Sequence, residues 1–162
     1  MVHNLRKIDS RLNLTLVGSP SNAKQESYAS KVQSSYHDFV ESGWLSFKPS
    51  LSREEIPNFL LKQDLFIHAY RGSLDKTLVE ATLFGMPVIT NNEEYLNEFG
   101  RWGAARLTGS TLLDEAQSFF SNSDESRSFE LIRRQNIALE SHGLEQWATK
   151  ISEILLLSIK DG

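Results

Sequence analysis

Short apolar runs recur along the first half of the chain and predict its strands. They cover residues 12–18, 44–47, 65–69 and 86–90, and they are rich in β-branched or aromatic residues. Because these runs are largely continuous in apolar residues rather than alternating, they are typical of strands that are covered on both faces. We therefore expect a parallel sheet.

The stretches between these runs predict helices. Residues 21–41, 52–63 and 73–84 carry apolar side chains at roughly helical spacing among polar ones. Ser52 and Glu55 resemble a capping box at the start of the second stretch. Strand and helix alternate with short turns, so we expect an α/β, Rossmann-like fold, a doubly wound parallel sheet with helices on both faces.

The rest of the chain predicts a helical C-terminal region. Residues 105–107 are a candidate for a last strand, and Glu93 and Glu94 are interpreted as part of a solvated turn. The length suits one domain over residues 1–162. Two apolar helix faces are expected from Ser110 onward, one of Leu112, Leu113, Ala116, Phe119 and Phe120, the other of Leu144, Trp147, Ala148, Ile151, Ile154 and Leu155.

The net charge and the absence of cysteine limit the classes of partner and of site that we expect. The chain has 17 Lys and Arg against 21 Asp and Glu, a net charge of −4, and no long basic run. This balance disfavours nucleic acid and anionic membranes as partners. No cysteine is present, so disulfides and thiolate metal sites are excluded, and no window approaches the ~20 apolar residues of a membrane span. We expect a cytoplasmic protein.

The densest polar pattern lies between the third and fourth predicted strands. Ser73, Lys76, Thr77 and Glu80 fall at i, i+3, i+4 and i+7, so they share one face of the predicted helix. That helix starts at the carboxyl end of a strand, where open α/β sheets bind ligands, and its amino end favours an anion such as phosphate. The alternative is that Lys76 and Glu80 form only a surface ion pair.

Residues at the end of this predicted helix, and those that follow it, resemble a family motif. Glu80-Ala81, Gly85 and Pro87-Val88-Ile89 resemble a motif of the carboxyl-terminal half of retaining glycosyltransferases of the GT-B type, the glycosyl transferases group 1 family. In that family a segment of the form E-x7-E-A-x3-G-x-P-V-I lies in the nucleotide-sugar pocket. The similarity extends over about residues 12–90.

The resemblance implies a set of donor-binding residues. Glu80 matches the second motif glutamate, whose carboxylate accepts hydrogen bonds from ribose hydroxyls. The first motif glutamate, which contacts the donor sugar in relatives, is replaced by Gly72, and no counterpart of the family's basic pair is found. Residues 72–76 resemble a Gly-Ser-x-Asp-Lys segment of some relatives, in which the backbone N–H groups and the Lys lie near the diphosphate. Asp75 then either replaces part of the sugar contact or only caps the helix. The implied donor-binding residues are Gly18, Ser19, Lys48, Pro49, Leu51, His68, Tyr70, Arg71, Gly72, Ser73, Leu74, Asp75, Lys76, Thr77 and Glu80.

The function implied is that of a domain that binds a nucleotide-sugar donor for retaining glycosyl transfer in polysaccharide, glycolipid or glycoconjugate synthesis. The acceptor domain or a second subunit is missing from this chain, so we expect the chain alone to be inactive. No catalytic side chain, metal or cofactor is assigned. His68 is interpreted either as a hydrogen-bonded core residue or as a pocket residue. The alternative function is a non-catalytic Rossmann-like module for nucleotide binding or protein interaction.

Overall fold

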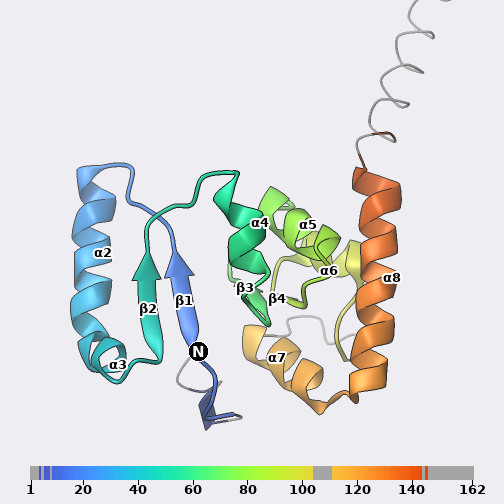
Figure 1. The fold of residues 1–162 in the computed structure, drawn as a ribbon, viewed down its shortest axis with the longest axis horizontal. Coiled ribbons are helices and arrows are strands. Elements are labelled where there is room, and N and C mark those ends of the chain that lie inside the picture. The colour runs from blue at the N-terminus through green and yellow to red at the C-terminus, as the bar shows by residue number, and fades with distance from the viewer. Residues whose placement is uncertain (1–3, 5, 8, 104–110, 144, 146–162) are drawn as a thin grey trace, which may run out of the picture. The chain divides into compact units, whose positions relative to one another are not determined.

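The computed structural model describes residues 4, 6–7, 9–103, 111–143 and 145. These residues form a mixed α/β protein with short parallel strand pairs (Figure 1). The chain divides into two compact units, Met1–Phe59 and Leu60–Gly162, named unit 1 and unit 2 below. In the described part of the chain, no helix combines the length and the apolar character needed to cross a membrane.

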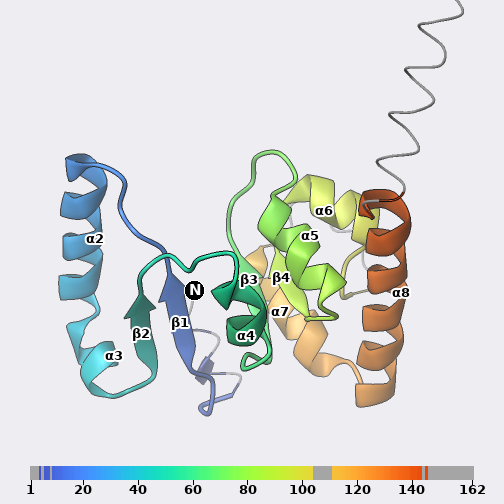
Figure 2. The same cartoon turned by 45° about the horizontal axis from the view of Figure 1, so that its top comes forward.

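Unit 1 is built on a parallel pair of strands. Strand β1 (Leu14–Val17) pairs with β2 (Leu45–Lys48), and α2 (Ala23–Ser35) and α3 (His37–Glu41) connect them (Figures 1 and 2). Both strands are confirmed, but the single helix predicted over residues 21–41 is interrupted. The backbone leaves the helical region at Tyr36, with φ −116° and ψ 21°.

Few side chains of unit 1 are buried. Trp44 and Leu45 are its buried apolar residues in the described part, and α2 buries none. Leu16 and Val17 are 40% and 43% exposed. The expectation that every strand is covered on both faces is therefore wrong for β1, because α2 covers too little of it. Helix α4 (Glu55–Leu60) follows as a short helix, and the Ser52 N–H donates to the Glu55 carboxylate at 2.8 Å, which is half of the predicted capping box.

Unit 2 contains the second parallel pair. Strand β3 (Phe66–His68) pairs with β4 (Val88–Thr90), and α5 (Lys76–Leu83) connects them. All three residues of β4 are buried, as predicted for a covered strand. Helix α5 packs against β4 and against α8 (Asp124–His142), which runs beside it (Figures 1 and 2).

Two further helices complete unit 2. Helix α7 (Leu112–Ser121) packs on β4 and buries Leu112, Ala116 and Phe119, members of the predicted face. Helix α6 (Glu93–Phe99) stands where a solvated turn was expected, so that interpretation is wrong. Its amino end is capped by Asn92, whose side chain accepts from the Tyr95 N–H at 2.9 Å, and its apolar residues enter the core.

The core of unit 2 holds a buried arginine. Arg134 of α8 is 1% exposed, and its guanidinium carbon lies 4.0 Å from the centre of the Trp102 ring. Its Nη2 donates to the Gly100 carbonyl at 3.0 Å. Burial lowers the pKa of the Arg134 guanidinium. The side chain therefore connects α8 with the segment after α6.

The mixed α/β class and the parallel pairing are confirmed. The described strands form two hydrogen-bonded pairs, β1–β2 and β3–β4. A doubly wound Rossmann-like sheet stays a prediction. The candidate strand at residues 105–107 and the predicted apolar face from Leu144 to Leu155 lie outside the described residues.

Candidate functional site

In unit 1, the loops that leave the two strands line one groove. Its volume is about 470 Å³, and Gly18, Ser19, Lys48 and Pro49 are among the residues that line it. Two hydrogen bonds join the loops, from the Gly18 N–H to the Lys48 carbonyl at 3.0 Å and from the Ser50 N–H to the Ser19 hydroxyl at 2.9 Å. These four residues form two pairs that lie about thirty positions apart in the chain. The structure brings both pairs together at the carboxyl ends of β1 and β2.

The groove combines an apolar wall with a cation. Leu16 and Phe47 of the strands and Tyr28 and Val32 of α2 supply the apolar surface. The Lys48 ammonium lies 5.9 Å from the centre of the Phe59 ring. A ligand that joins a planar, mostly apolar ring to an anionic group would suit this wall and this cation. Leu51, also expected at this site, is half-buried but is not part of the lining.

Tyr28 is a groove residue that sequence analysis did not find. Its spacing within α2 suggested a side chain of the packed helix face, yet it is 70% exposed. A tyrosine left exposed beside a groove offers a ring face for stacking. The helical period alone does not distinguish this position from a core position.

In unit 2, the loop between β3 and α5 carries most of the other predicted residues. Asp75 caps α5: its side chain accepts from the Thr77 N–H at 2.8 Å and from the Thr77 hydroxyl at 2.7 Å. His68 Nε2 lies 3.4 Å from the Asp75 carboxylate. Partial burial alone would raise the pKa of Asp75, but the bonds from Thr77 and the nearby His68 outweigh it, so this pKa lies below its usual value.

A buried asparagine fixes the shape of this loop. Asn92, which is fully buried, donates through its side-chain amide to the carbonyls of Tyr70, Gly72 and Ser73 at 3.3, 2.9 and 3.1 Å. The same side chain caps α6. Sequence analysis did not find Asn92, because its partners lie about twenty residues away in the chain.

Two expectations about this loop need correction. Ser73 was placed on the helix face with Lys76, but α5 begins only at Lys76, since Asp75 rather than Ser73 provides the cap. The amides of residues 73–75 were expected to be open to an anion. The Leu74 N–H instead donates to the carboxylate of Glu94 in the first turn of α6.

The polar face of α5 is present as predicted from Lys76 onward. Leu78 and Val79 are buried, whereas the side chains of Lys76 and Glu80 are 63% and 32% exposed. Lys76 Nζ lies 3.4 Å from Glu80 Oε1, so the ion pair of the alternative interpretation is present. Both groups remain within reach of a ligand on this face.

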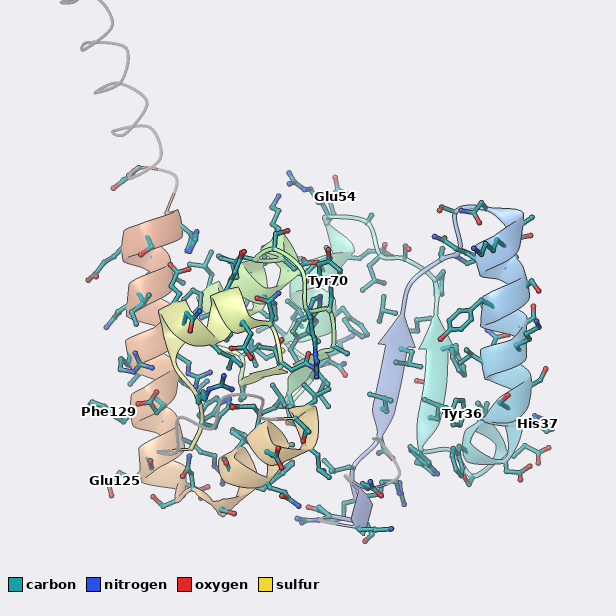
Figure 3. All side chains as sticks on the ribbon, turned by 180° about the vertical axis from the view of Figure 1, so that it is seen from behind. Tyr36, His37, Glu54, Tyr70, Glu125 and Phe129 are labelled. Atoms are coloured by element: carbon teal, nitrogen blue, oxygen red, sulfur yellow. The ribbon has the colours of Figure 1, made fainter. Side chains whose placement is uncertain are left out.

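The Tyr70 side chain covers Gly72. It lies on the loop after β3 and is 57% exposed (Figure 3). A Cβ atom added at Gly72 would collide with the Tyr70 ring and hydroxyl. The Tyr70 ring also meets His68 edge-on, with centroids 6.3 Å apart. A side chain at position 72 would therefore require the exposed Tyr70 ring to move.

Arg71, the last predicted residue of this loop, is held by an amide. With the Asn91 side chain oriented to satisfy its hydrogen bonds, its oxygen accepts from Arg71 Nε at 2.9 Å and from Nη2 at 3.2 Å. Its nitrogen donates to the Ala69 carbonyl at 3.2 Å. Asn91 is 9% exposed, so a nearly buried side chain orients an exposed arginine.

Comparisons leave the chain without a family. No protein-family model matches it, and comparisons with curated proteins and with solved structures find no match either. Within the described ranges, no group of three or more His, Cys, Asp or Glu side chains is placed to hold a metal ion. The function must therefore be argued from the geometry of the two loops.

Proposed function

We propose that this chain is the nucleotide-sugar-binding half of a retaining GT-B glycosyltransferase, with a doubly wound Rossmann-like architecture. An acceptor-binding domain or second subunit would complete the enzyme. The donor diphosphate leaves as the acceptor attacks, and its charge would be stabilised by Lys76 and by the positive end of the α5 dipole. No side-chain nucleophile is needed for this role.

The groove in unit 1 is the observation that supports this proposal most. Residues chosen from a motif comparison in two separate loops line one cavity at the carboxyl ends of parallel strands. Ligands bind at such ends in open α/β sheets. An apolar wall with Lys48 beside it suits a nucleobase followed by phosphate.

The polar face of α5 adds a second argument. Glu80 is half-buried on a helix whose opposite face is packed in the core, so its carboxylate has a fixed position. A carboxylate there can accept two hydrogen bonds from ribose hydroxyls. The ion pair with Lys76 does not conflict with this role, because both side chains keep exposed surface.

Calorimetry with UDP and GDP tests the proposal. We expect one of these nucleotides to bind, and Glu80→Ala to weaken it about ten-fold or more, because charge-assisted hydrogen bonds contribute about 1.5–3 kcal/mol. Glu140→Ala, an exposed carboxylate of α8, is the matched control and should leave the affinity unchanged. An unchanged affinity in a folded Glu80→Ala protein removes Glu80 from the site.

Lys76 separates the phosphate contact from the sugar contact. In Lys76→Ala, affinity for the nucleoside diphosphate should fall, while affinity for the bare nucleoside should stay similar. Equal losses for both ligands would contradict a contact between Lys76 and the diphosphate. Lys24→Ala on α2 is a control for the general loss of one positive charge.

Transfer itself requires more than this chain. The reaction needs donor and acceptor held together in a cleft that excludes water, and the second wall of that cleft belongs to the other domain in the GT-B arrangement. We expect weak donor binding and no sugar transfer in an incubation with radiolabelled nucleotide sugars and lipid or saccharide acceptors. Sustained transfer by the purified chain would contradict the half-enzyme proposal.

Exposed apolar residues on α8 favour a second candidate, a non-catalytic module for protein association. Phe129, Ile132 and Leu139 are 68%, 61% and 54% exposed, and Figure 3 shows Phe129 projecting from this helix. Exposed apolar groups of this kind mark interaction surfaces when they are contiguous. Failure to bind any nucleotide, together with self-association that Phe129→Ser abolishes, would favour this candidate.

A further inference from the structure

Arg71 is oriented for binding an anion. Its Nε and Nη2 both donate to one oxygen of Asn91, which leaves the outer edge of the guanidinium for a ligand. Among the described residues its partner is a neutral amide rather than a carboxylate. An arginine held in place without a neutralising charge loses little freedom when it binds a planar anion.

The carboxylates around the same loop are engaged elsewhere. Asp75 accepts from Thr77 and lies beside His68, Glu80 lies beside Lys76, and Glu94 accepts from the Leu74 N–H. Each of these groups therefore has a donor other than Arg71. The positive charge of Arg71 stays available at the carboxyl end of β3.

Because position 72 is a glycine, it adds no negative charge to the loop after β3. The Tyr70 ring fills the space that a side chain at Gly72 would occupy, so a glutamate does not fit without moving Tyr70. A carboxylate at this position would repel an anionic ligand and neutralise Arg71. Position 72 therefore carries no carboxylate, and the Tyr70 phenol lies over it.

We propose that the donor sugar of this chain carries a carboxylate, as a uronic acid does, and that Arg71 binds it. The planar guanidinium matches a carboxylate with two parallel hydrogen bonds, and the Tyr70 hydroxyl can donate to or accept from a neighbouring sugar hydroxyl. This inference rests on the proposed function, because it concerns the sugar end of the same donor site.

Matched ligand pairs test the inference. UDP-glucuronate differs from UDP-glucose only at C6, where a carboxylate replaces a hydroxymethyl group, and GDP-mannuronate differs from GDP-mannose in the same way. Calorimetry on the full chain should give about ten-fold tighter binding for the uronate of the pair whose base is accepted. Equal affinities for both sugars would overturn the inference while leaving the proposed function standing.

Arg71→Gln separates the sugar contact from a phosphate contact. This variant keeps a polar side chain next to Asn91, and it should bind the uronate no better than the neutral sugar, with an unchanged affinity for UDP or GDP alone. Arg71→Lys keeps the charge but loses the planar fork, so it should retain part of the preference. Arg53→Gln, an exposed arginine of unit 1, should retain all of it.

Each outcome has one meaning. An equal loss of UDP or GDP affinity in Arg71→Gln would place Arg71 at the diphosphate and overturn the inference alone. A chain that binds neither UDP nor GDP, with or without sugar, fails the proposed function and this inference with it. A uronate preference that persists in a folded Arg71→Gln protein assigns the selectivity to another residue and also overturns the inference.

Discussion

Units 1 and 2 contain the same local structure, a parallel pair of short strands connected through helices, but they differ in burial. In unit 2, β4 is entirely buried, whereas in unit 1 the second half of β1 is exposed. The described part of unit 1 buries two apolar side chains, Trp44 and Leu45. Unit 2 buries Leu60, Leu78, Val79, Ala81, Met86, Val88, Ile89, Tyr95, Leu96, Phe99, Trp102, Leu112, Ala116, Phe119 and Ala138.

The difference lies in the helices rather than the strands. Helix α5 buries four of its residues in the core and packs against β4 and α8, whereas α2 has no buried residue. An isolated two-stranded pair is marginally stable in water, and it needs packed helices to gain stability. We infer that unit 2 supplies most of the stability of the described chain, while much of the apolar surface of β1 in unit 1 stays exposed.

The largest expected effect is the loss of a core aromatic ring. Phe99 is fully buried and stacks on Tyr95, with ring centroids 4.5 Å apart. Phe99→Ala should lower the free energy of unfolding by about 3–5 kcal/mol. The matched change in unit 1 is Phe47→Ala, which removes a half-buried ring and should cost about 1 kcal/mol. Urea unfolding monitored by circular dichroism measures both, and equal losses would contradict the comparison.

Hydrogen exchange compares two equivalent amides. The Phe66 N–H donates to the Pro87 carbonyl at 2.9 Å, and the Leu14 N–H donates to the Trp44 carbonyl at 2.7 Å. Both bonds begin a parallel pair, so the bonds themselves do not predict different protection. We expect exchange at Phe66 to be about a hundred-fold slower, because β4 is buried and opens with the core. Equal rates measured by NMR would show that the units are equally stable.

The strands could be predicted because their residues are apolar in short runs, and this property does not depend on distant neighbours. The break at Tyr36 could not, since the apolar spacing continues through it. Helix α6 was missed because its first turn, Glu93 and Glu94, is acidic and looks like a solvated turn. Its Asn92 cap and its buried Tyr95 and Phe99 were present in the sequence as a short helical pattern.

The candidate site also contains residues that the sequence analysis named and residues that it missed. Ser19 and Lys48 lie just after the end of β1 and at the end of β2. They were implied by the family resemblance, while the apolar runs indicated where the chain turns, and both line the groove. Asn91 and Asn92 were missed, because each acts on a loop about twenty residues earlier in the chain. The sequence also contains no sign that Glu94 takes the Leu74 amide.

Two pairs of hydroxyl groups, one in each unit, compare buried and exposed hydrogen bonds, with a smaller expected effect on the free energy of unfolding. In unit 2 the Tyr95 and Thr82 hydroxyl oxygens lie 2.7 Å apart in the core, and Thr82 donates to the Leu78 carbonyl, so Tyr95 is the donor to Thr82. Tyr95→Phe should cost about 1–1.5 kcal/mol.

Unit 1 provides the control for this change. The Ser46 hydroxyl donates to the Thr15 hydroxyl at 3.0 Å, but this pair is exposed to water. Ser46→Ala should therefore change the free energy of unfolding by less than about 0.5 kcal/mol. Thermal unfolding of both variants makes the test, and a neutral Tyr95→Phe would mean that the buried hydroxyl contributes no more than the exposed one.

The smallest effect concerns two helix caps and depends on pH. Asp75 caps α5, which packs in the core, and Asn22 caps α2, which buries nothing. Asp75→Ala should cost about 1 kcal/mol at pH 7, and Asn22→Ala should cost less, because α2 contributes little to the stability of the core. The pKa of Asp75 is lowered from 3.8 in the folded chain, so its carboxylate contributes this stability fully above 3.8 and loses it as pH falls below 3.8, through the lowered pKa of the folded chain. Asp75→Asn keeps a good cap without a titrating group. Its free energy of unfolding should therefore change less than that of the unmodified chain between pH 5 and pH 3, measured by urea unfolding at each pH, and parallel curves would exclude Asp75 as the titrating cap.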